Sequence, residues 1–263
     1  MAEGSEFAKG SYQEKYVAFL DLLGFKAQVE AAEIDETAHE KLREVLKLVH
    51  ESLCENPRIS FRLNYFSDCI VLSGERSADG LFEMFQSICL LVSNLMQHDV
   101  LIRGGLTAGK LHHSRDFLYG AALNRAYRLE SEVAKNPMIL LSDEVLEDAR
   151  RYGERHMGYL VEHDGKWFIH YLLQYQLYRN EPIYAGKVIL DRPAARVINF
   201  ICQRLNNDAG SVRGKAEWLR DYWNETVAKY GIFGKIEEGV PPDDNLGGPT
   251  IAIRRIYAGD LKR

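Results

Sequence analysis

The chain has few of the residues and runs that mark export, metal clusters or membrane insertion. Only four of its 263 residues are cysteine, they are widely spaced, and none forms a C-x-x-C pair. This spacing argues against a disulfide framework or a structural zinc site, and predicts buried, reduced thiols. The eight histidines show no H-x-x-x-H spacing. Their one adjacent cluster, His112-His113, is expected on a solvated loop.

Long apolar runs and an excess of charge of one sign are also lacking. The longest apolar runs, such as residues 87–95, are too short to cross a bilayer, and the N-terminus has no charged segment followed by an apolar one. The net charge of −5 argues against broad binding to nucleic acid. We therefore expect a cytoplasmic protein with 46% apolar and 27% charged residues, the composition of an ordinary globular chain.

The hydrophobic pattern predicts alternating strands and helices. Apolar or alternating runs indicate strands at residues 16–20, 59–66, 69–72, 100–109 and 138–141, and amphipathic stripes indicate helices at 42–53, 81–95 and 120–133. The first six elements have the βαββαβ order of a ferredoxin-like sheet with helices on one face, an α+β fold. Two further amphipathic helices are expected at 194–205 and 214–230. We divide the chain into a flexible leader (1–12), a main domain (13–185) and a C-terminal helical extension packed on it (186–263).

Two aspartates at strand ends are poorly explained by packing. Asp21 ends the first apolar strand, just before the turn at Gly24, and Asp68 lies at the tip of the hairpin between the second and third strands. In a ferredoxin-like sheet the first and third strands are neighbours, so the two carboxylates should meet at one edge. Such a pair is suited to binding divalent cations.

A glycine-rich stretch imitates a phosphate-binding loop. Residues 104–110 match G-x-x-x-x-G-K after a strand, but Leu111 stands where the motif needs a hydroxyl, and residues 111–116 resemble a loop instead of a helix. We interpret these glycines as strand positions where another part of the backbone comes close.

A helix with Asn124 and Arg128 at i, i+4 follows the predicted strand at residues 100–109, on which Arg103 lies. Together with F-x-D-x-x-G-F around Asp21 and with the hairpin acid Asp68, this order of motifs resembles the class III nucleotidyl cyclases. The resemblance covers about residues 16–141 and makes 13–185 the catalytic domain.

The resemblance implies a role for each matched residue. Asp21, Asp68 and the carbonyl of Leu22 would bind two divalent cations, Mn²⁺ or Mg²⁺. The amides of Leu23, Gly24 and Phe25 would hold the triphosphate, and Arg103 would contact a phosphate. Asn124 would orient the ribose, and Arg128 would stabilise charge on the α-phosphate. Because such sites take their metal ligands from one subunit and the Asn/Arg pair from the other, a head-to-tail homodimer is implied.

The positions that read the base depart from the purine cyclases. Asn64 replaces the lysine or glutamate found four residues before the hairpin acid, and Phe117 replaces the acid found seven residues before Asn124. An amide can satisfy uracil or cytosine, and an apolar ring narrows the pocket. The pattern is similar to the bacterial Pycsar pyrimidine cyclases of anti-phage defence.

This resemblance implies conversion of UTP to 3′,5′-cyclic UMP and pyrophosphate, with the product read by a separate effector that senses cyclic nucleotides. UTP is preferred over CTP because it is the commoner substrate of that group, and no residue of the chain argues for either base. A cytidylate cyclase, a purine cyclase with an unusual pocket and a non-catalytic cyclase homology domain stay open as alternatives. No direct contact with nucleic acid or with a membrane is expected.

Overall fold

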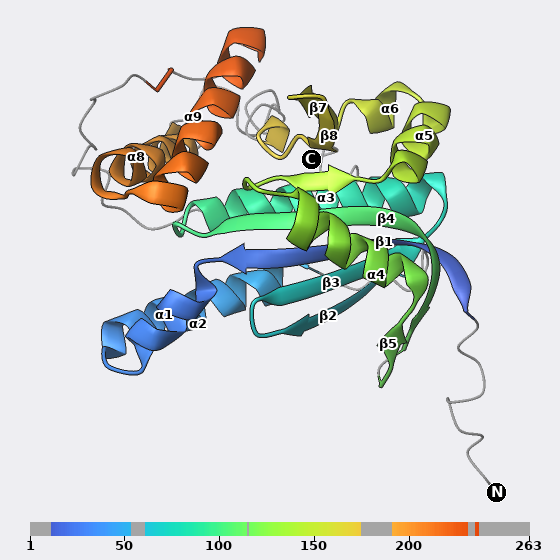
Figure 1. Ribbon diagram of the computed structural model, residues 1–263, viewed down its shortest axis with the longest axis horizontal. Coiled ribbons are helices and arrows are strands. Elements are labelled where there is room, and N and C mark those ends of the chain that lie inside the picture. The colour runs from blue at the N-terminus through green and yellow to red at the C-terminus, as the bar shows by residue number, and fades with distance from the viewer. Residues whose placement is uncertain (1–11, 54–60, 115, 175–190, 231–234, 237–263) are drawn as a thin grey trace, which may run out of the picture. The chain divides into compact units, whose positions relative to one another are not determined.

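A computed structural model of the protein describes residues 12–53, 61–114, 116–174, 191–230 and 235–236 (Figure 1). The chain forms two compact units. The first, which we call the sheet unit, comprises Met1–Leu23, Leu53–Gln86 and Ile102–Ile169, and the second, the helical unit, comprises the rest. The boundaries predicted from the sequence lie beside residue 12 and within 175–190. They adjoin or fall within residues that the structure does not describe, and they stay predictions.

The sheet unit is built around one mixed sheet. Its strands are β1 (Gln13–Leu23), β2 (Arg62–Phe66), β3 (Cys69–Glu75), β4 (Leu101–His113), β5 (Leu118–Tyr119), β6 (Ile139–Leu141), β7 (Leu160–His163) and β8 (Lys166–Ile169). They lie in the order β2-β3-β1-β4-β6-β8-β7, with β5 paired to β4. The first four strands therefore have the ferredoxin-like order, and the predicted α+β class is confirmed.

The register of β1 against β3 decides which side chains share a face. The two strands are antiparallel, with Phe19 opposite Val71 and Asp21 opposite Cys69. On β2, Asn64 pairs with Val71 and Phe66 with Cys69. Because side chains alternate along a strand, all of these residues lie on the same face.

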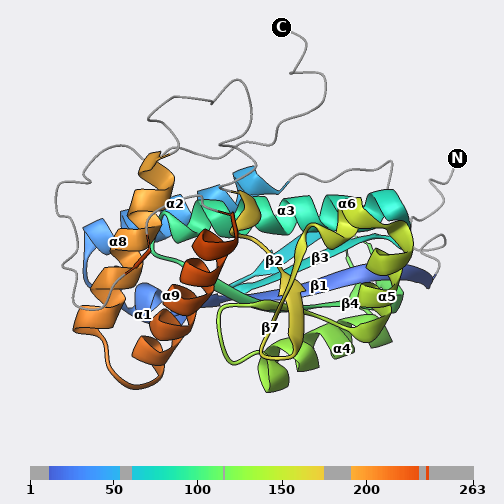
Figure 2. The same ribbon diagram turned by 90° about the horizontal axis from the view of Figure 1, so that it is seen from above.

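Helices cover both faces of this sheet. The first half of α3 (Ala78–Met96) buries Leu81, Met84 and Phe85 completely. On the other face, α4 (Ala121–Arg128) packs Ala122 and Ala126 into a cluster with Val17 of β1. Figure 2 shows α3 and α4 on opposite sides of the strands. The helices of the first six elements were expected on one face of the sheet. The next helix, α4, lies on the other face.

A π-helical turn, η3 (Leu129–Val133), continues α4, so the predicted helix over 120–133 is present with two geometries. The sheet unit also contains α5 (Asp143–Tyr152) and α6 (Glu154–Met157). Within the described residues, every helix is too short or too polar to cross a membrane.

The helical unit contains α1 (Phe25–Ala32), α2 (Glu36–Ser52), the second half of α3, α8 (Asp191–Asn207) and α9 (Gly210–Tyr230). The predicted C-terminal helices are therefore present. Tyr222 of α9 is fully buried and contacts Nδ1 of His170 through its hydroxyl at 2.6 Å. Burial lowers the pKa of His170 to about 4, so this ring is neutral at pH 7. Cys89 and Cys202 are buried free thiols, as expected, whereas Cys69 is a free thiol that is only partly buried and Cys54 lies outside the described residues.

Candidate functional site

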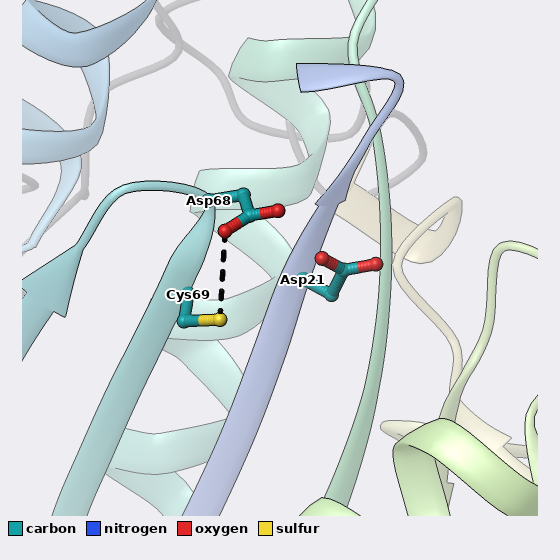
Figure 3. A group of neighbouring side chains, drawn as sticks. All are labelled: Asp21, Asp68 and Cys69. Carbon is teal, nitrogen blue, oxygen red and sulfur yellow. Dashed lines mark hydrogen bonds between the residues drawn. The ribbon is translucent and has the colours of Figure 1, made fainter. Parts of the chain in front are cut away.

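The structure brings Asp21 and Asp68 together at the end of β1. A carboxylate oxygen of each and the sulfur of Cys69 all lie within 4.8 Å of one another. All three side chains are half-buried, and Figure 3 shows Asp21 on β1 beside Cys69 at the start of β3 and Asp68 in the turn before it. The expected meeting of the two acids at one edge of the sheet is therefore observed.

Backbone contacts hold the two acids in place. The amide of Leu22 donates to the carbonyl oxygen of Asp68 at 3.0 Å, which ties the end of β1 to the hairpin. The hairpin turn is the predicted two-residue one: Phe66 pairs with Cys69, and Ser67 has a φ of 56°. A short hairpin against a central strand is a rigid support for the carboxylates.

The donor chemistry of this cluster fits a hard divalent cation. Carboxylate oxygens are the ligands that Mg²⁺ and Mn²⁺ prefer. The Cys69 thiol donates to Oδ1 of Asp68 at 3.6 Å. Burial, with the nearby charges of Asp68 and Asp21, raises the pKa of Cys69 to about 11. The sulfur is thus a neutral thiol at pH 7 and a poor metal ligand compared with the two carboxylates.

Arg103 lies between two acids instead of pointing away from the cluster. Its guanidinium donates to Oδ2 of Asp21 at 3.2 Å and makes a close ion pair with Glu130 of η3. Desolvation raises the pKa of Glu130, and Arg103 opposes that shift. Because an arginine stays charged, it compensates part of the negative charge gathered here.

Glu130 is the residue that the sequence interpretation missed. Its side chain is buried, although acids are rarely buried unless they are paired. The signal was present: Ala122, Ala126 and Glu130 recur at i, i+4 and i+8, so the acid occupies a core-facing position of the helix. An acid at such a position predicts a buried cationic partner, which is Arg103.

Asn124 and Arg128 lie on the outward side of α4, and both are exposed. Tyr127 between them packs edge-to-face on Phe19 of β1, with ring centroids 5.3 Å apart. The structure does not bring the Asn/Arg pair to the carboxylates of the same chain by any contact among its described residues. Both side chains are instead available to a molecule outside this chain.

The turn after Asp21 has the predicted left-handed glycine. Gly24 has a φ of +82°, and α1 starts at the next residue, Phe25. Leu23 ends β1 in the sheet unit, while Gly24 and Phe25 belong to the helical unit. The role of these three amides therefore stays a prediction.

The histidine pair was expected on a loop, and this prediction was wrong. His112 and His113 are the last residues of β4, which continues without interruption through the glycine-rich stretch. The residues of β4 that were interpreted as a decoy for a phosphate-binding loop are thus strand residues, as expected. His113 is buried, contacting Oγ of Ser73 at 2.7 Å and Oδ1 of Asn64 at 3.3 Å.

Phe117 lies in the turn between β4 and β5, and its ring is 49% exposed. The amide of Ser114 donates to the Phe117 carbonyl at 2.8 Å, and the amide of Phe117 donates to Oγ of Ser114 at 3.0 Å. This tight turn directly follows His113. Asn64 and Phe117, the two positions expected to read the base, are therefore both linked to the end of β4.

Comparison with known proteins gives only distant similarities. No family model and no curated protein matches the chain. Among solved structures, a guanylyl cyclase domain of the RhoGC fusion protein from the aquatic fungus Blastocladiella emersonii matches with a TM-score of 0.45 and 17% identity over 60% of this chain and 95% of that one.

Two further solved structures are similar to a comparable degree. The catalytic core of a rhodopsin-guanylyl cyclase with converted specificity, in complex with ATPαS, has a TM-score of 0.41 and 16% identity over 60% of this chain and 95% of that one. A bacterial light-regulated adenylyl cyclase has a TM-score of 0.41 and 17% identity over 51% of this chain and 44% of that one. We assign the fold from the strand order and register of this chain and not from these distant similarities.

Proposed function

We propose that the protein is a metal-dependent nucleotidyl cyclase that acts on a pyrimidine triphosphate, with UTP as its substrate. The observation that carries this proposal is the convergence of Asp21 and Asp68 at the end of β1. They lie on a ferredoxin-like sheet whose following helix presents Asn124 and Arg128 to the outside. Carboxylates can bind the cations that accompany a triphosphate, and an exposed amide and guanidinium can contact a ribose and a phosphate.

The reaction forms one bond and breaks one bond at the α-phosphorus. The 3′-oxygen of the ribose attacks, the bond between that oxygen and the phosphorus forms, and the bond to the bridging oxygen of pyrophosphate breaks. The proton of the hydroxyl is released to solvent. Divalent cations bound by Asp21 and Asp68 would lower the pKa of that hydroxyl and neutralise the leaving group.

The chain's own groups supply orientation and charge. The Asn124 amide would hold the ribose with its 3′-oxygen in line, and Arg128 would stabilise the charge that develops on the α-phosphate. Arg103 donates to Asp21 and so restrains its carboxylate. Leu22, Leu23, Gly24 and Phe25 would contribute backbone groups to the cations and the triphosphate, at a helix start that favours anions.

Asn124 and Arg128 face outward, and this supports a head-to-tail homodimer as the active form. In such a symmetric pair, each site takes its carboxylates from one subunit and its amide–guanidinium pair from the other. The product would be released to a separate effector that senses cyclic nucleotides, in keeping with a role in bacterial anti-phage defence.

The test is incubation of the pure protein with Mn²⁺ and each of the four triphosphates, followed by identification of the product by mass. We expect cyclic UMP and pyrophosphate from the wild type, and at least a hundredfold less product from Asp21→Asn and Asp68→Asn, since each loses a charged ligand.

Asp164→Asn is the matched control. Asp164 lies in the exposed turn between β7 and β8 and has a φ of 53°, a conformation that asparagine tolerates well. The activity of the Asp164→Asn variant should therefore equal that of the wild type. Product formation that survives either substitution at the sheet edge would contradict the metal assignment. A purine triphosphate as the best substrate would contradict the assignment of the base.

A further inference from the structure

The side-chain amide of Asn64 contacts a buried histidine, His113. Asn64 is on β2, half-buried, on the same face of the sheet as Asp21. Its Oδ1 lies 3.3 Å from Nε2 of His113, at the end of β4. A side-chain amide has a donor end and an acceptor end, and this contact decides which end faces the histidine.

The partner of the other ring nitrogen determines which nitrogen of His113 carries the proton. Nδ1 of His113 lies 2.7 Å from the hydroxyl of Ser73, a residue of β3 that is fully buried. Among the described residues, this is the only side-chain hydrogen bond of that hydroxyl. A buried hydroxyl donates its hydrogen where it can, so Ser73 donates to Nδ1 and the ring proton resides on Nε2.

The charge of His113 does not alter this arrangement. Burial lowers the pKa of His113 to about 4, and the positive charges of Arg62 and Lys15 act in the same direction. The ring is therefore neutral at pH 7, with a single N–H. That N–H points to Asn64, which must receive it with its oxygen.

Asn64 is thereby fixed in one of its two orientations. The oxygen faces His113 and the NH₂ group lies on the side away from it. An amide that is free to rotate by 180° can bind either uracil or cytosine, because the two bases present opposite orders of donor and acceptor at N3 and C4. An amide fixed by the series Ser73, His113 and Asn64 presents only one order.

We propose that His113 is a positioning residue that makes the site selective for a base with a carbonyl at C4, uracil, over one with an amino group there, cytosine. The NH₂ of Asn64 can donate to the uracil O4, whereas the cytosine amino group would place a donor against a donor. This inference rests on the proposed function, and it supplies the reason for UTP over CTP that the sequence alone did not contain.

The experiment measures kcat/KM for UTP and for CTP in the presence of Mn²⁺. In His113→Phe the ring remains but its N–H is lost, so Asn64 can rotate, and the UTP-to-CTP ratio should fall about tenfold. Asn64→Asp keeps His113 and Ser73 but presents only acceptors, so it should reverse the preference toward CTP. His112→Phe is the matched control, because it makes the same change one position away on the other face of β4 and should leave the ratio unchanged.

Each outcome has a distinct meaning. A wild type that cyclises both pyrimidines but prefers CTP contradicts this inference and the choice of UTP, while the assignment as a pyrimidine cyclase stands. A ratio that is the same in His113→Phe and wild type contradicts the inference alone. A wild type that cyclises no pyrimidine contradicts the proposed function and with it this inference. A loss of activity with an unchanged ratio would mean that His113 only supports the fold, and would overturn the inference even though the cyclase assignment stands.

Discussion

Arg103 bridges two carboxylates of different exposure, Asp21 at the open edge of the sheet and Glu130 beneath it. The Glu130 side chain is only 4% exposed, against 19% for Asp21 and 23% for Arg103. A charge this deeply buried is stable only with a partner, since removal of one member leaves the other uncompensated. Glu130 therefore supports Arg103, and Arg103 in turn supports Asp21.

This arrangement predicts the effect of removing one charge. Glu130→Gln keeps a hydrogen-bond acceptor for Arg103 but loses the negative charge, so the free energy of unfolding should fall by about 1–3 kcal/mol. Urea unfolding followed by circular dichroism measures it.

Glu132→Gln is the matched control, because Glu132 is exposed on the same π-helical turn. Its free energy of unfolding should stay within about 0.5 kcal/mol of the wild type. Equal losses in both variants would show that the ion pair with Arg103 contributes nothing specific.

The contact between α4 and β4 positions the outward-facing Asn/Arg pair relative to the sheet. A Cβ added at Gly105 would lie 2.5 Å from the carbonyl oxygen of Ala126 and 2.8 Å from Cβ of Leu129. Thr107, two residues on, donates from its hydroxyl to the carbonyl of Ala122 at 2.8 Å. The helix lies so close to the strand that only glycine fits between them.

Gly105→Ala should consequently displace α4 and its side chains. Overpacking of this kind costs about 1–3 kcal/mol of stability, and cyclase activity should fall more than tenfold because Asn124 and Arg128 move with the helix. Thermal unfolding and product formation are measured on the same preparation.

The comparison is Gly214→Ala in α9. Nothing lies within 4 Å of a Cβ added at Gly214, so alanine should leave activity unchanged and stabilise the helix by up to about 1 kcal/mol. Full activity and stability in Gly105→Ala would show that α4 does not need its close contact with β4.

At the scale of the whole molecule, the separation of the two groups that we propose to form one site has the most consequences. The carboxylates lie at the sheet edge, and the Asn/Arg pair faces outward from α4. Exposed aromatic rings accompany them, with Tyr65 52%, Phe66 84% and Tyr127 52% exposed. Aromatic residues are enriched in surfaces that another chain covers, which is in keeping with the proposed dimer.

The proposed head-to-tail dimer predicts complementation between two inactive variants. Asp21→Asn lacks one half of the site and Asn124→Ala the other, so each alone should be inactive. Mixed in equal amounts with exchange of subunits, they should recover about one quarter of wild-type activity, because half of the dimers are mixed and each contains one intact site.

Mixing Asp21→Asn with Asp68→Asn is the matched control. Both substitutions affect the same half, so no pairing restores a site and no activity should return. Activity recovered in neither mixture, with subunit exchange confirmed by mass, would place both halves within one chain.

Most of the element order could be predicted from local patterns. The alternation before Asp68 and the stripes of α2 and α3 have the periods of a strand and of helices, and the short run 16–20 is of β type by its length and composition. The two-residue hairpin placed Asp68, and the ferredoxin-like order placed it beside Asp21. These predictions depend on spacing along the chain, which the sequence contains completely.

Local patterns could not predict contacts between residues that are far apart in the sequence. His112-His113 looks like a polar loop because its neighbours along the chain are polar, yet β4 continues through it and buries His113 against Ser73 and Asn64. Likewise the pairing of Arg103 with Glu130 joins residues on a strand and a helix that meet only in the folded sheet unit.

The sequence alone therefore contains the two acids, the Asn/Arg pair and an amide that could read either pyrimidine. The tertiary structure decides how that amide is oriented. The reason is physical: an isolated amide rotates freely between two equivalent orientations, and only a donor fixed by another strand removes one of them. That donor, Nε2 of His113, reaches Asn64 because the end of β4 places the histidine side chain against Ser73 of β3 and Asn64 of β2.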